Sequence, residues 1–158
     1  MYGWIIGGLA GLDLGVKHVI EQQEITTFPR DLPSAGGMIQ LHKNHNYGFP
    51  FGFLKEKPDL VRGIPLVIIS AMAGALGTLM MEKGKTFEKL GLSIALGGAV
   101  SNLYDRLIRG YVVDYASIRW KGLERTVFNL GDLFVFLGSG MFILAQAVRS
   151  TRGVRKKK

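Results

Sequence analysis

Four apolar stretches that are almost free of charged side chains constrain this chain more than any other feature. They cover about residues 2–20, 64–81, 90–104 and 127–148, and a helix needs roughly 20 such residues to cross the hydrocarbon core of a bilayer. Charged side chains are concentrated between these stretches, a distribution untypical of both ordinary soluble domains and disordered chains. We therefore expect an all-α membrane protein with four transmembrane helices, folded as one integral membrane domain over residues 1–158.

The connections between the spans set the expected topology. Four spans place both termini on one side of the membrane and the long loops 21–63 and 105–126 on the other. Six of the 20 Lys and Arg lie in the basic tail 149–158, directly after the last span, which favours cytoplasmic termini. The two long loops are then extracytoplasmic.

The loop 21–63 is too long to be a simple connection. Its residues Met38–His42 alternate between apolar and polar, Asn46-Tyr47-Gly48 has turn composition, and Phe49–Leu54 is apolar again. This pattern predicts a small hairpin lying on the membrane surface.

Composition excludes several kinds of site. Without cysteine there is no disulfide, thiol nucleophile or cysteine metal site. His18, His42 and His45 do not follow the HExxH spacing of zinc hydrolases, so we expect no metal and no cofactor. The formal charge of +8 suggests a nucleic-acid partner, but a basic tail facing anionic lipid explains much of it. The expected partner is the lipid bilayer, and no nucleic acid.

Small residues follow one face of the first span. Gly3, Gly7, Gly11 and Gly15 recur at every fourth position, so another helix backbone can approach that face closely. We interpret these glycines as a packing seam, either within the chain or between copies. The oligomeric state stays open, with a monomer favoured.

Ionisable residues inside predicted spans suggest functional or structural polar sites. Asp13 and Lys17 are four residues apart, which suits a self-neutralising ion pair on one helix that holds helices together, with a supporting role at a site as the alternative. Asp105 and Arg106 end the third span, and we interpret them as a salt-bridged helix end.

Two further acids have no basic neighbour in the sequence. Asp114 lies in a β-branched and aromatic run, and Asp132 lies some five residues inside the fourth span. Because both flank one loop, both are expected near the same membrane face. Two carboxylates in a low-dielectric pocket share a proton, so one can activate water while the other protonates a carbonyl oxygen. The alternative is two unrelated polar residues.

A resemblance to a known family favours the paired acids. The chain contains, in order, Asp13-x-x-x-Lys17, Asn46-Tyr47-Gly48, Gly97-Gly98-x-x-Ser101-Asn102-x-x-Asp105-Arg106, Gly110-x-Val-Val-Asp114 and Phe128-Asn129-x-x-Asp132. In order and approximate spacing, this series resembles lipoprotein signal peptidase (signal peptidase II).

The resemblance implies a four-helix bacterial membrane aspartic endopeptidase with both termini in the cytoplasm and an extracytoplasmic β-cradle between helices 1 and 2. Its substrates are prolipoproteins with diacylglyceryl on a cysteine, which it cuts just before that cysteine. Residue by residue, the resemblance implies the catalytic pair Asp114 and Asp132, a structural pair Asp13 and Lys17, and substrate-positioning residues Asn46, Asn102, Arg106 and Asn129.

The chain also departs from the family's pattern. Ser101 replaces a usual glycine, Gly131 a usual alanine, and Leu133 a small hydroxyl residue, while Phe49-Pro50 stands where the family has two alanines. These changes lie beside the expected substrate contacts, so substrate preference stays open, as does a divergent paralogue.

Other functions also fit parts of the pattern. A Ser/Lys protease would use Lys17 with Ser101 or Ser139. A small ion- or proton-relay transporter component would use Asp13, Asp114 and Asp132. A purely structural membrane subunit is a third alternative.

Overall fold

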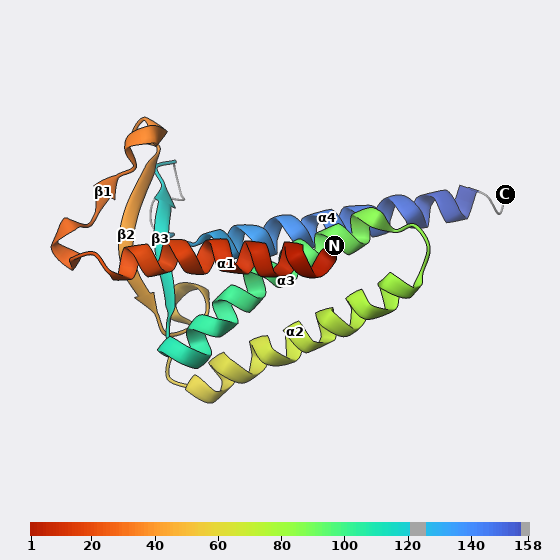
Figure 1. Ribbon diagram of the computed structural model, residues 1–158, viewed down its shortest axis with the longest axis horizontal. Coiled ribbons are helices and arrows are strands. Elements are labelled where there is room, and N and C mark those ends of the chain that lie inside the picture. The colour runs from red at the N-terminus through yellow and green to blue at the C-terminus, as the bar shows by residue number, and fades with distance from the viewer. Residues whose placement is uncertain (121–125, 156–158) are drawn as a thin grey trace.

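The computed structural model describes residues 1–120 and 126–155. The α-helices of this part are α1 (Tyr2–Glu21), α2 (Pro58–Met81), α3 (Thr86–Tyr104) and α4 (Leu130–Arg155). A π-helical turn, η4 (Asp105–Arg109), continues α3, and 3-10 turns cover Ile25–Thr27, Pro33–Ala35 and Pro50–Gly52. A small sheet lies at one end of the helices, away from both termini (Figure 1).

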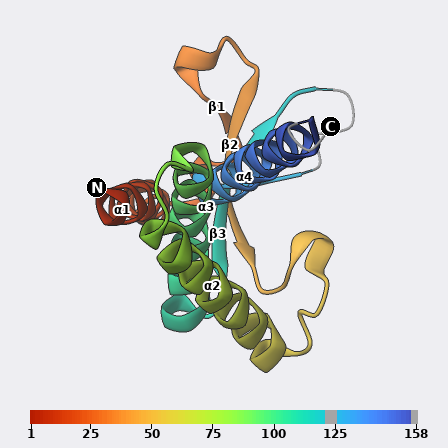
Figure 2. The same cartoon turned by 90° about the vertical axis from the view of Figure 1, so that its right-hand side faces the viewer.

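Helix α3 is the centre of the bundle. It packs against α1, α2 and α4, and a view along the helices shows the other three arranged around it (Figure 2). Its buried residues include Ser93, Ser101 and Asn102. Because these polar groups are covered by protein, they can form hydrogen bonds inside the bundle without exposure to lipid.

Three of the helices in the described residues are long and apolar enough to cross a membrane: α1, α2 and the Leu130–Thr151 part of α4. They match the spans predicted near 2–20, 64–81 and 127–148. Helix α3 is less apolar than these three segments, because glycine, serine and asparagine are among the residues that it buries against its neighbours. The third predicted span, over 90–104, therefore stays a prediction.

Close backbone contacts hold α3 against α4. A Cβ built on Gly98 would lie 2.1 Å from the carbonyl oxygen of Gly131, and one on Gly138 would lie 2.3 Å from the Ala95 nitrogen. Only glycine fits at such crossings. The predicted seam is elsewhere: Gly3, Gly7, Gly11 and Gly15 are exposed, and a Cβ on any of them meets no atom of the described residues within 4 Å. Of the two alternatives for this seam, packing within the described part of the chain is therefore not observed, and packing between copies stays a prediction.

Helix boundaries differ from the predicted spans. Helix α2 begins at Pro58, a residue favoured in the first turn of a helix. Helix α4 begins at Leu130 rather than near 127, because Phe128 is paired with strand residue Ala116 through two backbone hydrogen bonds. Asp132 therefore lies in the first turn of α4 and not five residues inside it. Beyond the predicted span, α4 continues to Arg155; tail residues 156–158 and loop residues 121–125 lie outside the described residues.

The sheet joins the two long loops. Its strands β1 (Arg30–Asp31), β2 (Ile39–Asn46) and β3 (Val112–Ile118) are antiparallel in the order β1-β2-β3. The β2–β3 register places Asn44 opposite Asp114, with an irregularity between Leu41 and Asn44. The cradle thus takes a strand from between α3 and α4 as well as from between α1 and α2, which corrects its predicted location.

The predicted hairpin is also corrected. The strand near Met38–His42 is present as β2, but the segment Phe49–Leu54 does not return along it. Phe49 donates its N–H to the Phe53 carbonyl at 2.8 Å and the chain makes a tight 3-10 turn over Pro50–Gly52. Pro50 has no N–H for a strand ladder, so β2 pairs with β3 instead.

Candidate active site

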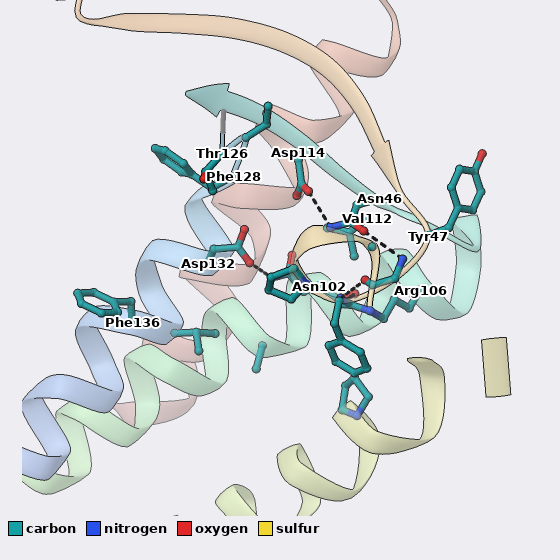
Figure 3. A pocket seen from close by; sticks show the side chains of 18 of the residues that line it. Asn46, Tyr47, Asn102, Arg106, Val112, Asp114, Thr126, Phe128, Asp132 and Phe136 are labelled. Carbon is teal, nitrogen blue, oxygen red and sulfur yellow. Dashed lines mark hydrogen bonds between the residues drawn. The ribbon is translucent and has the colours of Figure 1, made fainter. Parts of the chain in front are cut away.

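The sheet and parts of α2, α3 and α4 line a cavity of about 1130 Å³. Its polar wall holds five of the predicted site residues, and Figure 3 shows them facing the same space from β2, β3, α3, η4 and α4: Asn46, Asn102, Arg106, Asp114 and Asp132. Its other wall is apolar and includes Ile68, Phe136 and Ile143. The cavity therefore joins a carboxylate-bearing end to an apolar groove between helices.

Asp114 faces the cavity from the central part of β3 and is 4% exposed. Each of its carboxyl oxygens accepts one side-chain amide: Asn129 Nδ2 donates to Oδ1 at 2.7 Å, and Asn46 Nδ2 donates to Oδ2 at 3.1 Å. Burial, and then the charge of Asp132, raise the pKa of Asp114 from 3.8 to about 6. A carboxyl with this pKa can carry a proton close to neutral pH.

Asp132 is held by a similar pair of N–H donors. Asn102 Nδ2 donates to its Oδ1 at 2.8 Å, and the backbone N–H of Asn129 donates to its Oδ2 at 3.2 Å. In return, the Asp132 N–H donates to Asn129 Oδ1 at 2.9 Å. This reciprocal pair is a capping box, with Asn129 as the N-cap and Asp132 at the third helical position. The spacing Asn-x-x-Asp was a sequence signal for the start of α4 at Leu130.

Asn129 connects the two acids. Its side-chain amide bonds Asp114 and its backbone bonds Asp132, and the residue is fully buried. A strand residue and a helix residue that are 18 positions apart are thereby held at one cavity. Four N–H groups point at the four carboxyl oxygens, so a water molecule or a substrate carbonyl meets two acids whose orientations are already fixed.

Arg106 forms part of the cavity wall in η4. Its Nη1 donates to the carbonyl of Asn102 at 3.2 Å, its Nη2 donates to that of Gly48 at 3.3 Å, and its Cζ lies 5.4 Å from the centre of the Phe49 ring. The buried Nε has no hydrogen-bond partner among the described residues. The guanidinium thus ties the turn after β2 to the end of α3, and it brings a positive charge to the same cavity as the acids.

Asp105 does not pair with Arg106, which corrects the predicted salt-bridged helix end. It turns into the bundle, where Lys17 Nζ lies 3.1 Å and Arg109 Nη1 2.6 Å from its carboxyl oxygens. Adjacent side chains of a helical turn point in different directions, so Asp105 and Arg106 of η4 contact different groups.

The predicted pair of Asp13 and Lys17 is present and belongs to a larger cluster. The two side chains are 2.8 Å apart and fully buried, as is Asp105. Lys17 also donates to Asn102 Oδ1 at 2.8 Å and to Ser101 Oγ at 3.2 Å. The cluster therefore contacts a residue that holds Asp132.

Ser101 and Tyr115 are polar residues whose contacts the sequence patterns did not predict. Ser101 Oγ donates to Asp13 at 2.5 Å and is fully buried, while Ser139 lines the cavity. Lys17 Nζ forms ion pairs with Asp13 and Asp105, and neither Lys17 nor Ser101 lines the cavity, an arrangement that does not favour a Ser/Lys protease. No pattern in the sequence pointed to Tyr115, because its partners come from α1 and α4.

Comparison with known proteins identifies the family and the fold. Residues 5–148 match the family model described as signal peptidase (SPase) II. Proteins named lipoprotein signal peptidase from Brucella ovis and Brucella melitensis are 32% identical over 142 residues, covering 85% of this chain and 82% of theirs. Two solved structures titled bacterial membrane enzyme share the fold at 21% identity: one has a TM-score of 0.80 over 96% of this chain and 90% of its own, the other 0.75 over 92% and 91%. The family model covers nearly the whole chain, and on that ground the chain belongs to the signal peptidase II family, a family of membrane proteases.

Proposed function

We propose that this protein is an aspartic endopeptidase that removes signal peptides from prolipoproteins, with Asp114 and Asp132 activating the attacking water. The observation that carries the proposal is that Asn129 donates a hydrogen bond to each acid, from its side chain to Asp114 and from its backbone to Asp132. The names of the relatives support the substrate class. The resemblance further supports a diacylglyceryl-modified cysteine next to the cleaved bond.

In the proposed mechanism the pair carries one proton, and the raised pKa of Asp114 favours Asp114 as its holder. The Asp132 carboxylate takes a proton from water as the water oxygen attacks the scissile carbonyl carbon. Asp114 gives its proton to the carbonyl oxygen, which yields a neutral tetrahedral diol. Asp132 then protonates the amide nitrogen, the C–N bond breaks, and a diol proton returns to Asp114.

The walls of the cavity support a lipid-bearing substrate. The acids lie at the polar end, and the apolar side chains of α2 and α4 extend away from them: Ile68, Ile69, Val135, Phe136 and Ile143. In this arrangement the diacylglyceryl chains lie along the apolar wall while the peptide crosses the polar end. The acyl chains also anchor the substrate in the same membrane as the enzyme, so lipidation is expected to lower the KM.

The proposed topology follows from the same arrangement. The four helices α1 to α4 cross the bacterial cytoplasmic membrane, both termini are cytoplasmic, and the sheet with the two acids lies at the extracytoplasmic face. The basic residues in the tail 149–158, at the end of α4 and after it, support this orientation.

The test is cleavage of one prolipoprotein, with and without diacylglyceryl, by the wild-type protein, Asp114→Asn and Asp132→Asn in detergent micelles. Both variants are expected to fold and to lose cleavage. Asn at position 132 keeps an acceptor for the capping box. Asp31→Asn is the matched control, since Asp31 is exposed on β1 and pairs only with Arg119 among the described residues. Turnover by either active-site variant, or equal cleavage of the unlipidated protein, would contradict the proposal.

A further inference from the structure

Tyr115 directly follows Asp114 on β3, so the two side chains leave opposite faces of the strand. Asp114 faces the cavity, whereas Tyr115 is 5% exposed and reaches into the helices. Its hydroxyl donates to Asp13 Oδ1 at 3.0 Å and accepts the backbone N–H of Leu130 at 3.0 Å. One oxygen atom therefore joins α1 to the first residue of α4.

The bond to Leu130 satisfies an otherwise unpaired donor. The first N–H groups of a helix have no partner inside the helix, and Leu130 is the first residue of α4. Its neighbour Asn129 bonds both acids, and Asp132 follows two positions later. A displacement of Leu130 consequently moves Asp132 and Asn129 relative to Asp114.

The Asp13 end of the tether is rigid. Its carboxylate is fully buried and accepts three donors: Tyr115 at Oδ1, and Ser101 and Lys17 at Oδ2. An ionised carboxylate can only accept, so the tyrosine proton points at Asp13 and the lone pairs of the phenol oxygen are left for Leu130. Burial and the charge of Asp13 raise the pKa of Tyr115, which keeps the phenol protonated in this role.

We propose that Tyr115 is a positioning residue for the cleavage reaction: its hydroxyl tethers the first turn of α4 to the buried Asp13 carboxylate and so sets the distance between Asp132 and Asp114. The proposal rests on the proposed function of the two acids. Tyr115 does not touch the cavity, so its loss affects the chemical step rather than substrate binding. Small misplacements of reacting groups lower rates far more than they lower affinity.

The test compares Tyr115→Phe with Tyr111→Phe. Both remove one hydroxyl and keep the ring, but Tyr111 is half-buried, stacks on His45 at 4.1 Å, and its hydroxyl has no hydrogen bond to the described residues. We expect Tyr115→Phe to lower kcat about tenfold, the equivalent of one lost hydrogen bond, with KM within about twofold of wild type. Without the tether we expect Asp132 to lie farther from Asp114 and to raise its pKa less. The alkaline limb of the pH–rate profile should therefore move to lower pH. Tyr111→Phe should change neither quantity.

Hydrogen–deuterium exchange provides a readout that does not depend on activity. Peptides covering 127–134 should exchange faster in Tyr115→Phe and unchanged in Tyr111→Phe. Unchanged exchange, or a kcat and pH profile equal to wild type in a folded Tyr115→Phe protein, overturns the tether. A kcat loss that only follows the unfolded fraction overturns it too. If the wild-type protein cleaves no prolipoprotein, the proposed function fails, and exchange alone then decides whether the tether exists.

Discussion

Asn102 donates its side-chain amide to Asp132 Oδ1 at 2.8 Å and thereby joins the end of α3 to the first turn of α4. The carbonyl oxygen of the same amide accepts the Lys17 ammonium at 2.8 Å. Because an ammonium can only donate, it fixes which end of the amide faces Asp132. A buried residue of α1 thus controls a donor in the candidate active site.

Replacing Lys17 by Met tests this arrangement. The substitution leaves the buried carboxylates of Asp13 and Asp105 without their shared cation. Removing one partner of a buried ion pair costs about 3–5 kcal/mol, so the melting temperature in detergent micelles should fall sharply. The double variant Lys17→Met/Asp13→Asn should recover part of that loss, since it also removes one uncompensated charge. Lys43→Met is the control, because Lys43 is only half-buried, bonds the backbone carbonyls of Glu21 and Gln23, and pairs at 3.8 Å with the partly exposed Glu21 carboxylate rather than with a fully buried one. A Lys17→Met protein as stable as wild type would contradict the cluster.

The raised pKa of Asp114 predicts a pH dependence of stability. The folded protein keeps this proton up to about pH 6, whereas the unfolded chain releases it near pH 3.8. The free energy of unfolding therefore falls as pH rises between these values, by about 3 kcal/mol in total, and stays low above them.

Asp114→Asn removes this titration. The stability of Asp114→Asn relative to wild type should therefore increase from pH 4 to pH 7, as measured by thermal unfolding in one detergent at each pH. Asp31→Asn, which changes an exposed carboxyl, should show no such trend. A difference between Asp114→Asn and wild type that is constant with pH would show that burial of Asp114 has no such effect.

The same carboxyl predicts the pH dependence of cleavage. If Asp114 donates its proton to the carbonyl oxygen, kcat/KM should decline as pH rises through about 6, because the proton is then lost from the free enzyme. Asn46→Ala removes a hydrogen bond that stabilises the ionised form, which should move this decline to higher pH. Initial rates at low substrate concentration from pH 4.5 to 8.5 provide the measurement. A flat profile, or a shift to lower pH in Asn46→Ala, would assign the proton to another group.

Much of the helical fold was predictable, because a membrane span is encoded locally in a run of apolar residues. That local signal explains the success for α1, α2 and α4. It does not say which helix becomes central, and among the described residues α3, the central helix, lacks the apolar stretch of membrane-spanning length that the other three α-helices have. The partner of β2 was not predictable either, since its pairing with β3 brings together segments some 70 positions apart.

In the candidate site, too, locally encoded features were predictable and features that depend on tertiary packing were not. Asp114 and Asp132 were predicted as a pair because neither has a basic neighbour in the sequence, and they do line one cavity. The contacts that hold them depend on tertiary packing: Tyr115 reaches Asp13, and Arg106 reaches Gly48. Asn129 is the exception, since its capping box with Asp132 has a recognisable spacing.

The contact between α3 and α4 yields the last prediction. A methyl group on Gly98 would lie 2.1 Å from the Gly131 carbonyl oxygen, so Gly98→Ala must push the first turn of α4 away from α3. Gly131 lies between Asn129 and Asp132, and this shift therefore disturbs the site as well. We expect the free energy of unfolding to fall by about 1–3 kcal/mol. The cleavage rate should fall by more than the loss of folded protein accounts for.

Gly11→Ala is the matched control for that substitution, because a Cβ there meets no atom of the described residues within 4 Å. Alanine is the better helix former, so Gly11→Ala should be neutral or more stable by up to about 1 kcal/mol. Thermal unfolding and prolipoprotein cleavage, measured on both variants in the same detergent, separate the two cases. Equal effects of the two alanines would mean that the crossing of α3 and α4 does not hold Asp132 in place.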